Sequence, residues 1–149
     1  MTTRTRKARS GRQGATMVEF LLVSVQLCLL MLAAFEFGRM VLIYTNVANA
    51  ARIGVRYAIT HGSSRIGAAG TTDGPATAAQ IEAMVRDYAR SGLVDTSRVI
   101  VTVAWPTNKE PGTPVSVTVT YQYDPFLVAA FGAVLNVNMG TTTKGYITY

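Results

Sequence analysis

The feature that most constrains this chain is the apolar stretch from Phe20 to Phe35. Over these sixteen residues only Ser24 and Gln26 interrupt a run of apolar or small side chains. A helix of that length rises about 24 Å, a little short of the roughly 30 Å hydrocarbon core of a bilayer. Adding Ala15 to Val18 supplies the missing turn. The sequence therefore predicts one membrane-spanning helix over about residues 15 to 36.

A single carboxylate, Glu19, lies at the start of this apolar run. In the span, the carboxylate would lie in or against the apolar layer, where its insertion costs roughly 2.5–3.5 kcal/mol of free energy. The cost is smaller if the carboxylate reaches the interface. An ionisable residue in such a position is by default functional and has a partner. If the chain is cut after Gly14, the new α-amine of Ala15 lies four residues from Glu19, and it can also meet Glu19 of a neighbouring copy.

The formal net charge of +6 is concentrated at the amino terminus. Five Lys or Arg residues and no acid lie among the first fourteen residues, whereas the nine basic and eight acidic residues after them nearly cancel. Beside an apolar helix, a basic leader over residues 1 to 14 predicts a cytoplasmic amino terminus, with contact to anionic lipid headgroups as a lesser role. We expect residues 1 to 13 to be disordered. A charge confined to one tail argues against a nucleic-acid partner.

Beyond the span, the apolar pattern predicts that the same helix continues to about residue 60, where His61-Gly62-Ser63-Ser64 ends it. Residues at alternating spacings of four and three form one helix face: Phe37, Val41, Tyr44, Ala48, Ala51, Val55 and Ala58. Ala50, Gly54 and Ala58 also lie four apart, a spacing that lets helix backbones approach closely. These small residues either pack on the protein's own sheet, the more ordinary interpretation, or contact another helix in an assembly.

Residues 61 to 149 predict a small ectodomain of α+β class. Thr77 and Gln80 have the spacing of a capping box, which predicts a second helix over about residues 77 to 91 before Gly92. Alternation with period two then predicts an antiparallel meander, with strands over about residues 99 to 105, 115 to 123 and 139 to 149. The predicted fold is a long N-terminal transmembrane and amphipathic helix, followed by one further helix and a three-stranded antiparallel sheet.

Before the last predicted strand lies an apolar segment, Phe126 to Leu135. Its ten residues are too few to span a bilayer. Three placements fit its composition: under the sheet, on the bilayer surface, or exposed as a patch for a partner. The sequence leaves these three open.

Residues suited to catalysis or metal binding are few and scattered. His61 is the only histidine, and the only cysteine, Cys28, lies in the apolar run, so no intrachain disulfide can form. A nucleophile needs a base beside it, and zinc needs three or four suitable ligands. The sequence therefore predicts a protein that is not an enzyme and that has no metal site and no cofactor.

Three spaced motifs resemble a known family. Gly14, followed by an apolar run with Glu19 at its fifth position, resembles a type IV prepilin cleavage site. The longer pattern resembles the TadE-like family of tight-adherence (Tad/Flp) pilus pseudopilins. Its parts are GATMVEF at 14–20, EFGR at 36–39 and NAARIGVRYA at 49–58. The resemblance covers residues 13 to about 60 closely and the ectodomain only in outline.

The resemblance implies a minor pseudopilin that initiates or assists assembly of a Tad/Flp-type IV pilus or secretion machine. It implies cleavage by a prepilin peptidase between Gly14 and Ala15. It further implies contacts with other pilin or pseudopilin subunits, with Tad inner-membrane assembly proteins and with the bilayer. The protein would cross the bacterial inner membrane once, with its C-terminal domain outside. The resemblance leaves open whether it lies in the pilus, at its tip or only at its base. The candidate assembly residues are Glu19, Phe20, Glu36, Arg39, Ala50, Gly54 and Ala58.

Glu36 and Arg39 lie three residues apart at the membrane exit and are spaced to pair on a helix. Such a pair is either an interfacial ion pair worth a few tenths of a kcal/mol or an assembly contact.

Two other fates of the leader stay open. In the first, the helix is an uncleaved signal anchor for an extracytoplasmic adhesion or interaction domain, and Gly14 and Glu19 are nearly neutral to mutation. In the second, a signal peptidase releases a secreted domain near Ala34, although Met31 and Leu32 make a poor small-residue cleavage site.

Overall fold

The computed structural model describes residues 10–68, 73–92, 94–105, 108–130, 132 and 135–148. Most of the predicted basic leader, residues 1 to 9, lies outside the described residues. The elements in chain order are α1 (Ser10–Thr60), α2 (Ala78–Ser91), a 3-10 turn (Thr96–Arg98), β1 (Val99–Ala104), β2 (Pro114–Tyr123), α3 (Phe126–Ala130) and β3 (Val137–Tyr146). The long helix, the second helix and the three-stranded antiparallel sheet confirm the predicted α+β fold.

Helix α1 is one continuous element of 51 residues, about 75 Å long at 1.5 Å per residue. It ends at Thr60, as predicted, but it begins at Ser10 rather than at Ala15. The cause is that Gly14 costs a helix interior only about 1 kcal/mol relative to Ala, and no proline precedes it. The Gly14–Ala15 bond therefore lies inside the helix.

The sheet has the order β1-β2-β3, with β2 in the centre of an antiparallel meander. Val99 pairs with Tyr121 in β2, and Tyr123 at the end of β2 pairs with Val137. The inward residues of β2 alternate with half-exposed ones as the period-two pattern predicts. Strand β3 begins two residues before its predicted start and ends three before its predicted end, although Ile147 beyond it is still buried.

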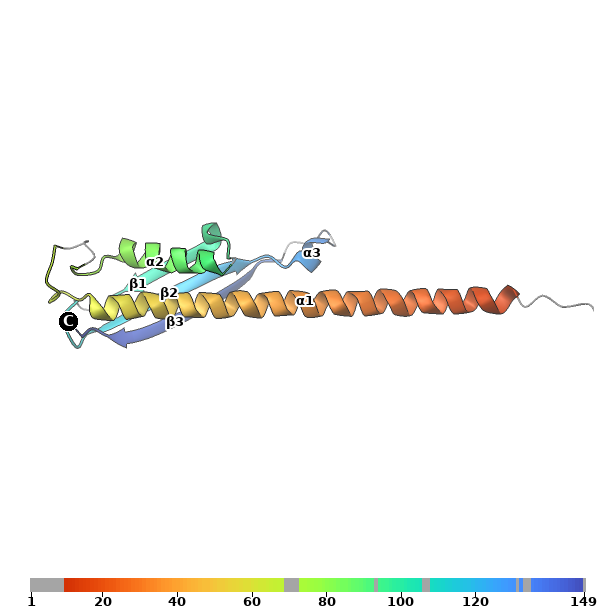
Figure 1. Cartoon of the computed structure of the whole chain (residues 1–149), viewed down its shortest axis with the longest axis horizontal. Coiled ribbons are helices and arrows are strands. Elements are labelled where there is room, and N and C mark those ends of the chain that lie inside the picture. Colours follow the sequence, from red (N-terminus) through yellow and green to blue (C-terminus); the bar gives the residue numbers. More distant parts are fainter. Residues whose placement is uncertain are drawn as a thin grey trace, which may run out of the picture.

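Figure 1 shows the second half of α1 lying beside α2 along the sheet, while the first half extends far beyond it. Helix α1 packs against β2 and β3, and α2 packs against β1 and α1. The core lies between these helices and the sheet. Its fully buried members include Val47, Ala51, Ile81, Val85, Val117 and Val119. The whole core of the described residues thus belongs to the ectodomain and to one half of α1.

The face of α1 that packs on the sheet differs from the predicted face near the membrane. Ala51, Val55 and Ala58 are buried as predicted, but Phe37 is 63% exposed and Tyr44 is 46% exposed. The buried positions there are Ile43 and Val47 instead. The predicted seam repeats every seven residues, and such a seam drifts by about 20° per heptad on a straight helix. A seam that is correct at Ala58 has therefore rotated off the sheet by Phe37.

Candidate functional site

The first half of α1 is an exposed apolar rod. Every residue from Gly14 to Phe35 is exposed except the half-exposed Ser24. Phe20, Leu22 and Met31 each expose about two-thirds or more of their surface, at 70%, 69% and 67%. Helix α1 is long and apolar enough to cross a membrane. So much apolar surface needs an apolar environment, and this half of α1 is the first part of the candidate site.

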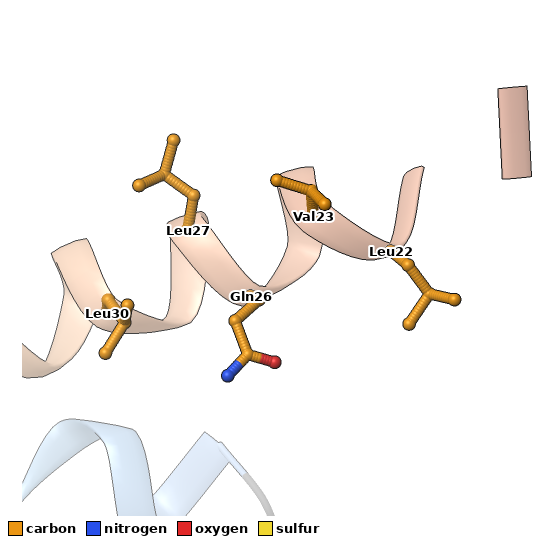
Figure 2. Close-up of a pocket in the computed structure, with 5 residues that line it drawn as sticks. All are labelled: Leu22, Val23, Gln26, Leu27 and Leu30. Carbon is orange, nitrogen blue, oxygen red and sulfur yellow. The ribbon is translucent and has the colours of Figure 1, made fainter. Parts of the chain in front are cut away.

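Polar side chains interrupt the rod on one side. Figure 2 shows Leu22, Gln26 and Leu30 pointing away from one side of the helix, and Val23 and Leu27 from the other. Gln26 lies seven residues after Glu19, so the two side chains lie on nearly the same face of the helix. In the described part of the chain neither side chain has a hydrogen bond or an ion pair, and both are exposed.

The second part of the site is the junction at Glu36, one residue past the apolar run. Glu36 Oε1 accepts hydrogen bonds from the Tyr123 hydroxyl and from the backbone N–H of Phe126, the latter at 3.0 Å. Arg39 Nη1 lies 3.6 Å from the same oxygen. The predicted Glu36–Arg39 pair is therefore present, and it is part of a larger cluster that joins α1 to the end of β2 and the start of α3.

The sequence predicts Tyr123 only as the last residue of the strand over about residues 115 to 123 and gives it no role in this cluster. It is 1% exposed. Burial, and then its hydrogen bond to Glu36, raise the pKa of Tyr123 to about 12, although the Arg39 guanidinium opposes that rise. The Arg39 guanidinium carbon also lies 5.2 Å from the centre of the Tyr123 ring. A buried tyrosine usually has a hydrogen-bond partner for its hydroxyl. A tyrosine at an inward position of a strand is therefore the sequence signal that could have indicated a polar partner here.

The Glu36 cluster fastens the ectodomain to the membrane-proximal part of α1. Glu36 is well covered, with 14% of its side chain exposed, whereas Arg39 is 43% exposed. One carboxylate thus receives two hydrogen bonds and a nearby cation from three different elements. The cluster fixes the end of the sheet at the level where the apolar run stops.

The small residues Ala50, Gly54 and Ala58 are buried in the protein's own core. A Cβ added at Gly54 would lie 2.7 Å from Val85 Cγ2 and 3.3 Å from Val117 Cγ1. Ala50 and Ala58 are 0% and 1% exposed. This is the first of the two roles weighed from the sequence, close packing of α1 on α2 and β2. It leaves these three residues no free surface for a second chain.

The predicted processing site lies at the opposite end of α1. Gly14 and Ala15 are exposed, and a Cβ added at Gly14 would meet nothing within 4 Å. Phe20, one residue past Glu19, is 70% exposed. None of these residues contacts the ectodomain, so the structure does not bring the processing site together with the Glu36 cluster.

No group of three or more His, Cys, Asp or Glu side chains that could hold a metal ion lies in the described ranges. His61 stacks on Tyr57 with ring centres 4.0 Å apart, and Cys28 is exposed in the apolar half of α1. They lie 33 residues apart, nearly all of them in α1, which corresponds to roughly 50 Å, so these two residues do not form a nucleophile and base pair.

The structure thus has one helix that is long and apolar enough to cross a membrane, and this helix continues into a small α+β domain that is fastened to it. Residues 14–56 match the family model described as TadE-like protein. This match confirms, for residues 14–56 of α1, the resemblance predicted from the three motifs, whereas the ectodomain lies outside the matched range. No curated protein and no solved structure matches the chain.

Proposed function

We propose that this protein is a TadE-like minor pseudopilin that acts in assembly of a Tad/Flp-type IV pilus or secretion machine. The observation that carries the proposal is the exposed apolar half of α1, which bears Glu19 and Gln26 on one face. The helix anchors the protein in the bacterial inner membrane, with the basic leader cytoplasmic and the ectodomain outside. Its assembly partners are other pilin or pseudopilin subunits and Tad inner-membrane proteins.

Cleavage by a prepilin peptidase between Gly14 and Ala15 prepares the helix for assembly. Before cleavage, five basic residues hold the helix end at the cytoplasmic face. After cleavage that end carries one amine, which Glu19 of an adjacent subunit neutralises where water is scarce. Because α1 is continuous through Gly14, the peptidase must unwind the helix locally, and a glycine in a helix makes this cheaper by about 1 kcal/mol.

Packing between helices of neighbouring subunits then uses the face that carries Glu19 and Gln26, with Phe20 about 100° around the helix from Glu19. In lipid, the hydrophobic effect does not drive helices together, and hydrogen bonds between polar side chains of different helices contribute to the pairing instead. Each such hydrogen bond supplies about 0.6–2 kcal/mol. Glu36 and Arg39 are already engaged with Tyr123 within one chain. We therefore assign them to holding the ectodomain, and we place the main assembly contacts at Glu19 and its neighbours.

One observation favours a second candidate, an uncleaved signal-anchored protein with an extracytoplasmic adhesion or interaction domain. The Gly14–Ala15 bond lies within a regular helix, four residues from its beginning. An uncut helix would keep the basic leader attached, and Gly14 would then have no special role.

The test is the amino-terminal sequence and intact mass of the protein isolated from the membrane fraction of its own host. A chain that begins at Ala15 supports the pseudopilin. An uncut chain supports the signal anchor, and a chain that begins near Phe35 means a secreted domain and removes Glu19 from the mature protein.

A further inference from the structure

Helix α3 (Phe126–Ala130) is an apolar element that the proposed function does not use. Figure 1 shows it beyond the end of the sheet, alongside the middle of α1, with which it is in contact. Its first residue, Phe126, donates its backbone N–H to Glu36 Oε1 at 3.0 Å. That hydrogen bond places Phe126 at the level of Glu36 along the long helix.

The level of Glu36 is where the membrane span ends. No charged residue lies between Glu19 and Glu36. A hydrocarbon core of roughly 30 Å takes about 20 helical residues, so a span that begins near Ala15 ends at about Phe35. Arg39, the next charge, lies one turn further on and is 43% exposed. Phe126 is thus held at the boundary between the apolar layer and water.

Three exposed phenylalanines surround the chain at this level. Phe35, Phe37 and Phe126 are 72%, 63% and 66% exposed. Phe35 and Phe37 flank Glu36 by about 100° on either side of the helix, and Phe126 is held on the Glu36 side itself. We call these three residues the phenylalanine collar. Phenylalanine side chains are typical of the apolar face of segments that lie in the membrane interface.

We infer that α3 is an interfacial membrane contact, in which Phe126 enters the outer leaflet between headgroups and acyl chains together with the rest of the phenylalanine collar. The occupant of this surface is phospholipid, because the collar is continuous with the apolar half of α1. The inference rests on the membrane anchoring in the proposed function. Its consequence is that the ectodomain touches the bilayer on one side, while Glu36 is kept bonded to protein groups.

The test uses the full-length chain in phospholipid vesicles whose acyl chains carry bromine, a contact quencher of tryptophan, either close to the headgroups or near the bilayer centre. The native Trp105, measured separately in the wild-type chain, is the reference, because it follows Ala104, which pairs with Ser116 at the end of β2 remote from Tyr123. In a Trp105→Phe background, Phe126→Trp reports on α3 and Leu27→Trp reports on the span. Ala129→Trp is a second reporter on α3, should the first variant misfold by circular dichroism.

The expected result is that Phe126→Trp loses most of its fluorescence with bromine near the headgroups and much less with bromine at the centre, whereas the wild-type Trp105 keeps its fluorescence. A quenched Leu27→Trp with an unquenched α3 reporter would overturn the inference, since water or protein would then cover α3. Stronger quenching of the α3 reporter by bromine at the bilayer centre than by bromine near the headgroups would contradict an interfacial position of α3. An unquenched Leu27→Trp would instead refute the membrane anchoring on which the inference depends.

Discussion

The two halves of α1 belong to one unbroken helix and yet bury their surfaces in opposite ways. In the half from Gly14 to Phe35, large side chains such as Phe20 and Leu22 are exposed on every side. In the half from Glu36 to Thr60, a narrow face is buried, and Arg52 and Arg56 lie exposed on the other side. A helix that is apolar all round suits lipid, and one with an apolar stripe suits a protein core.

The sizes of the side chains sharpen this contrast. The packed half presents Ala50, Ala51 and Gly54 to its neighbours, so that the backbone of α1 approaches α2 closely. The exposed half presents large Leu, Phe and Met side chains instead, and no described part of the chain buries them. Apolar composition alone therefore does not decide what covers a helix. The distribution of apolar side chains around the helix axis and the size of those side chains decide it.

The first prediction concerns Gly14, where the expected effect is the largest. Gly14→Leu should abolish cleavage after residue 14, because it alters the residue before the scissile bond and strengthens the helix that must unwind there. Gly38→Leu is the matched control, since a Cβ at either glycine would meet nothing within 4 Å. Intact mass of the membrane-fraction protein measures the outcome. If Gly14→Leu gave the same mature amino terminus as the wild type, prepilin processing at this site would be excluded.

The second prediction concerns the packed half. Gly54→Leu should lower the free energy of unfolding of the ectodomain by about 3 kcal/mol, the upper range for overpacking a core. The reason is that even a Cβ added at this position would crowd the side chains of Val85 and Ile81. Denaturant unfolding in detergent, followed by circular dichroism, measures this change. Gly38→Leu should have little effect on it. An equal loss of unfolding free energy in the two variants would contradict the close packing of α1 at Gly54.

Much of this architecture could be predicted because it is set locally. The capping box of Thr77 and Gln80 is present at the start of α2, and the predicted alternation with period two is present in the burial of β2. The Glu36 cluster could not be predicted in full, because Tyr123 lies 87 residues from Glu36 and meets it only through the packing of β2 on α1. The rotation of the buried face toward Ile43 could not be predicted either, because the sequence offers two apolar faces in this part of α1 and only the packing of the sheet selects one of them.

The third prediction concerns the boundary between the two halves. The pKa of Tyr123 is raised to about 12 from its ordinary 10.0, so the fold prefers the neutral phenol that donates to Glu36. Its contribution to stability is complete below pH 10 and is lost as the pH rises toward 12. A shift of that size corresponds to about 3 kcal/mol at most. Unfolding measured between pH 9 and pH 12 should show this loss in the wild type.

The control for that measurement removes only the titrating hydroxyl. Tyr123→Phe should be less stable at neutral pH by about 1.5 kcal/mol, the cost of a lost hydrogen bond to a charged group, and should lose less stability above pH 10. Tyr146→Phe, at a 71% exposed residue, should behave as the wild type. A Tyr123→Phe profile parallel to that of the wild type would mean that the Glu36 cluster does not titrate in this way.

The last prediction concerns the exposed half and has the smallest expected effect. Glu19→Ala should leave membrane insertion intact, or improve it, because a carboxylate in the apolar layer costs roughly 2.5–3.5 kcal/mol. It should nevertheless weaken incorporation into the pilus assembly several-fold, in line with the roughly 1 kcal/mol that a polar contact between helices supplies in lipid. The measurement is the fraction of the protein that co-purifies with sheared pili or the assembly complex, relative to the fraction in the membrane.

Gln26→Leu separates the role of the charge from that of polarity. It lies on nearly the same face as Glu19 and is uncharged, so it should reduce incorporation less than Glu19→Ala if the Ala15 amine is the partner of Glu19. Equal losses would indicate that both side chains hydrogen-bond across helices and that the amine is not required. Unchanged incorporation of Glu19→Ala would contradict pairing at Glu19, and the exposed half of α1 would then be a lipid anchor whose polar residues have no partner in the assembly.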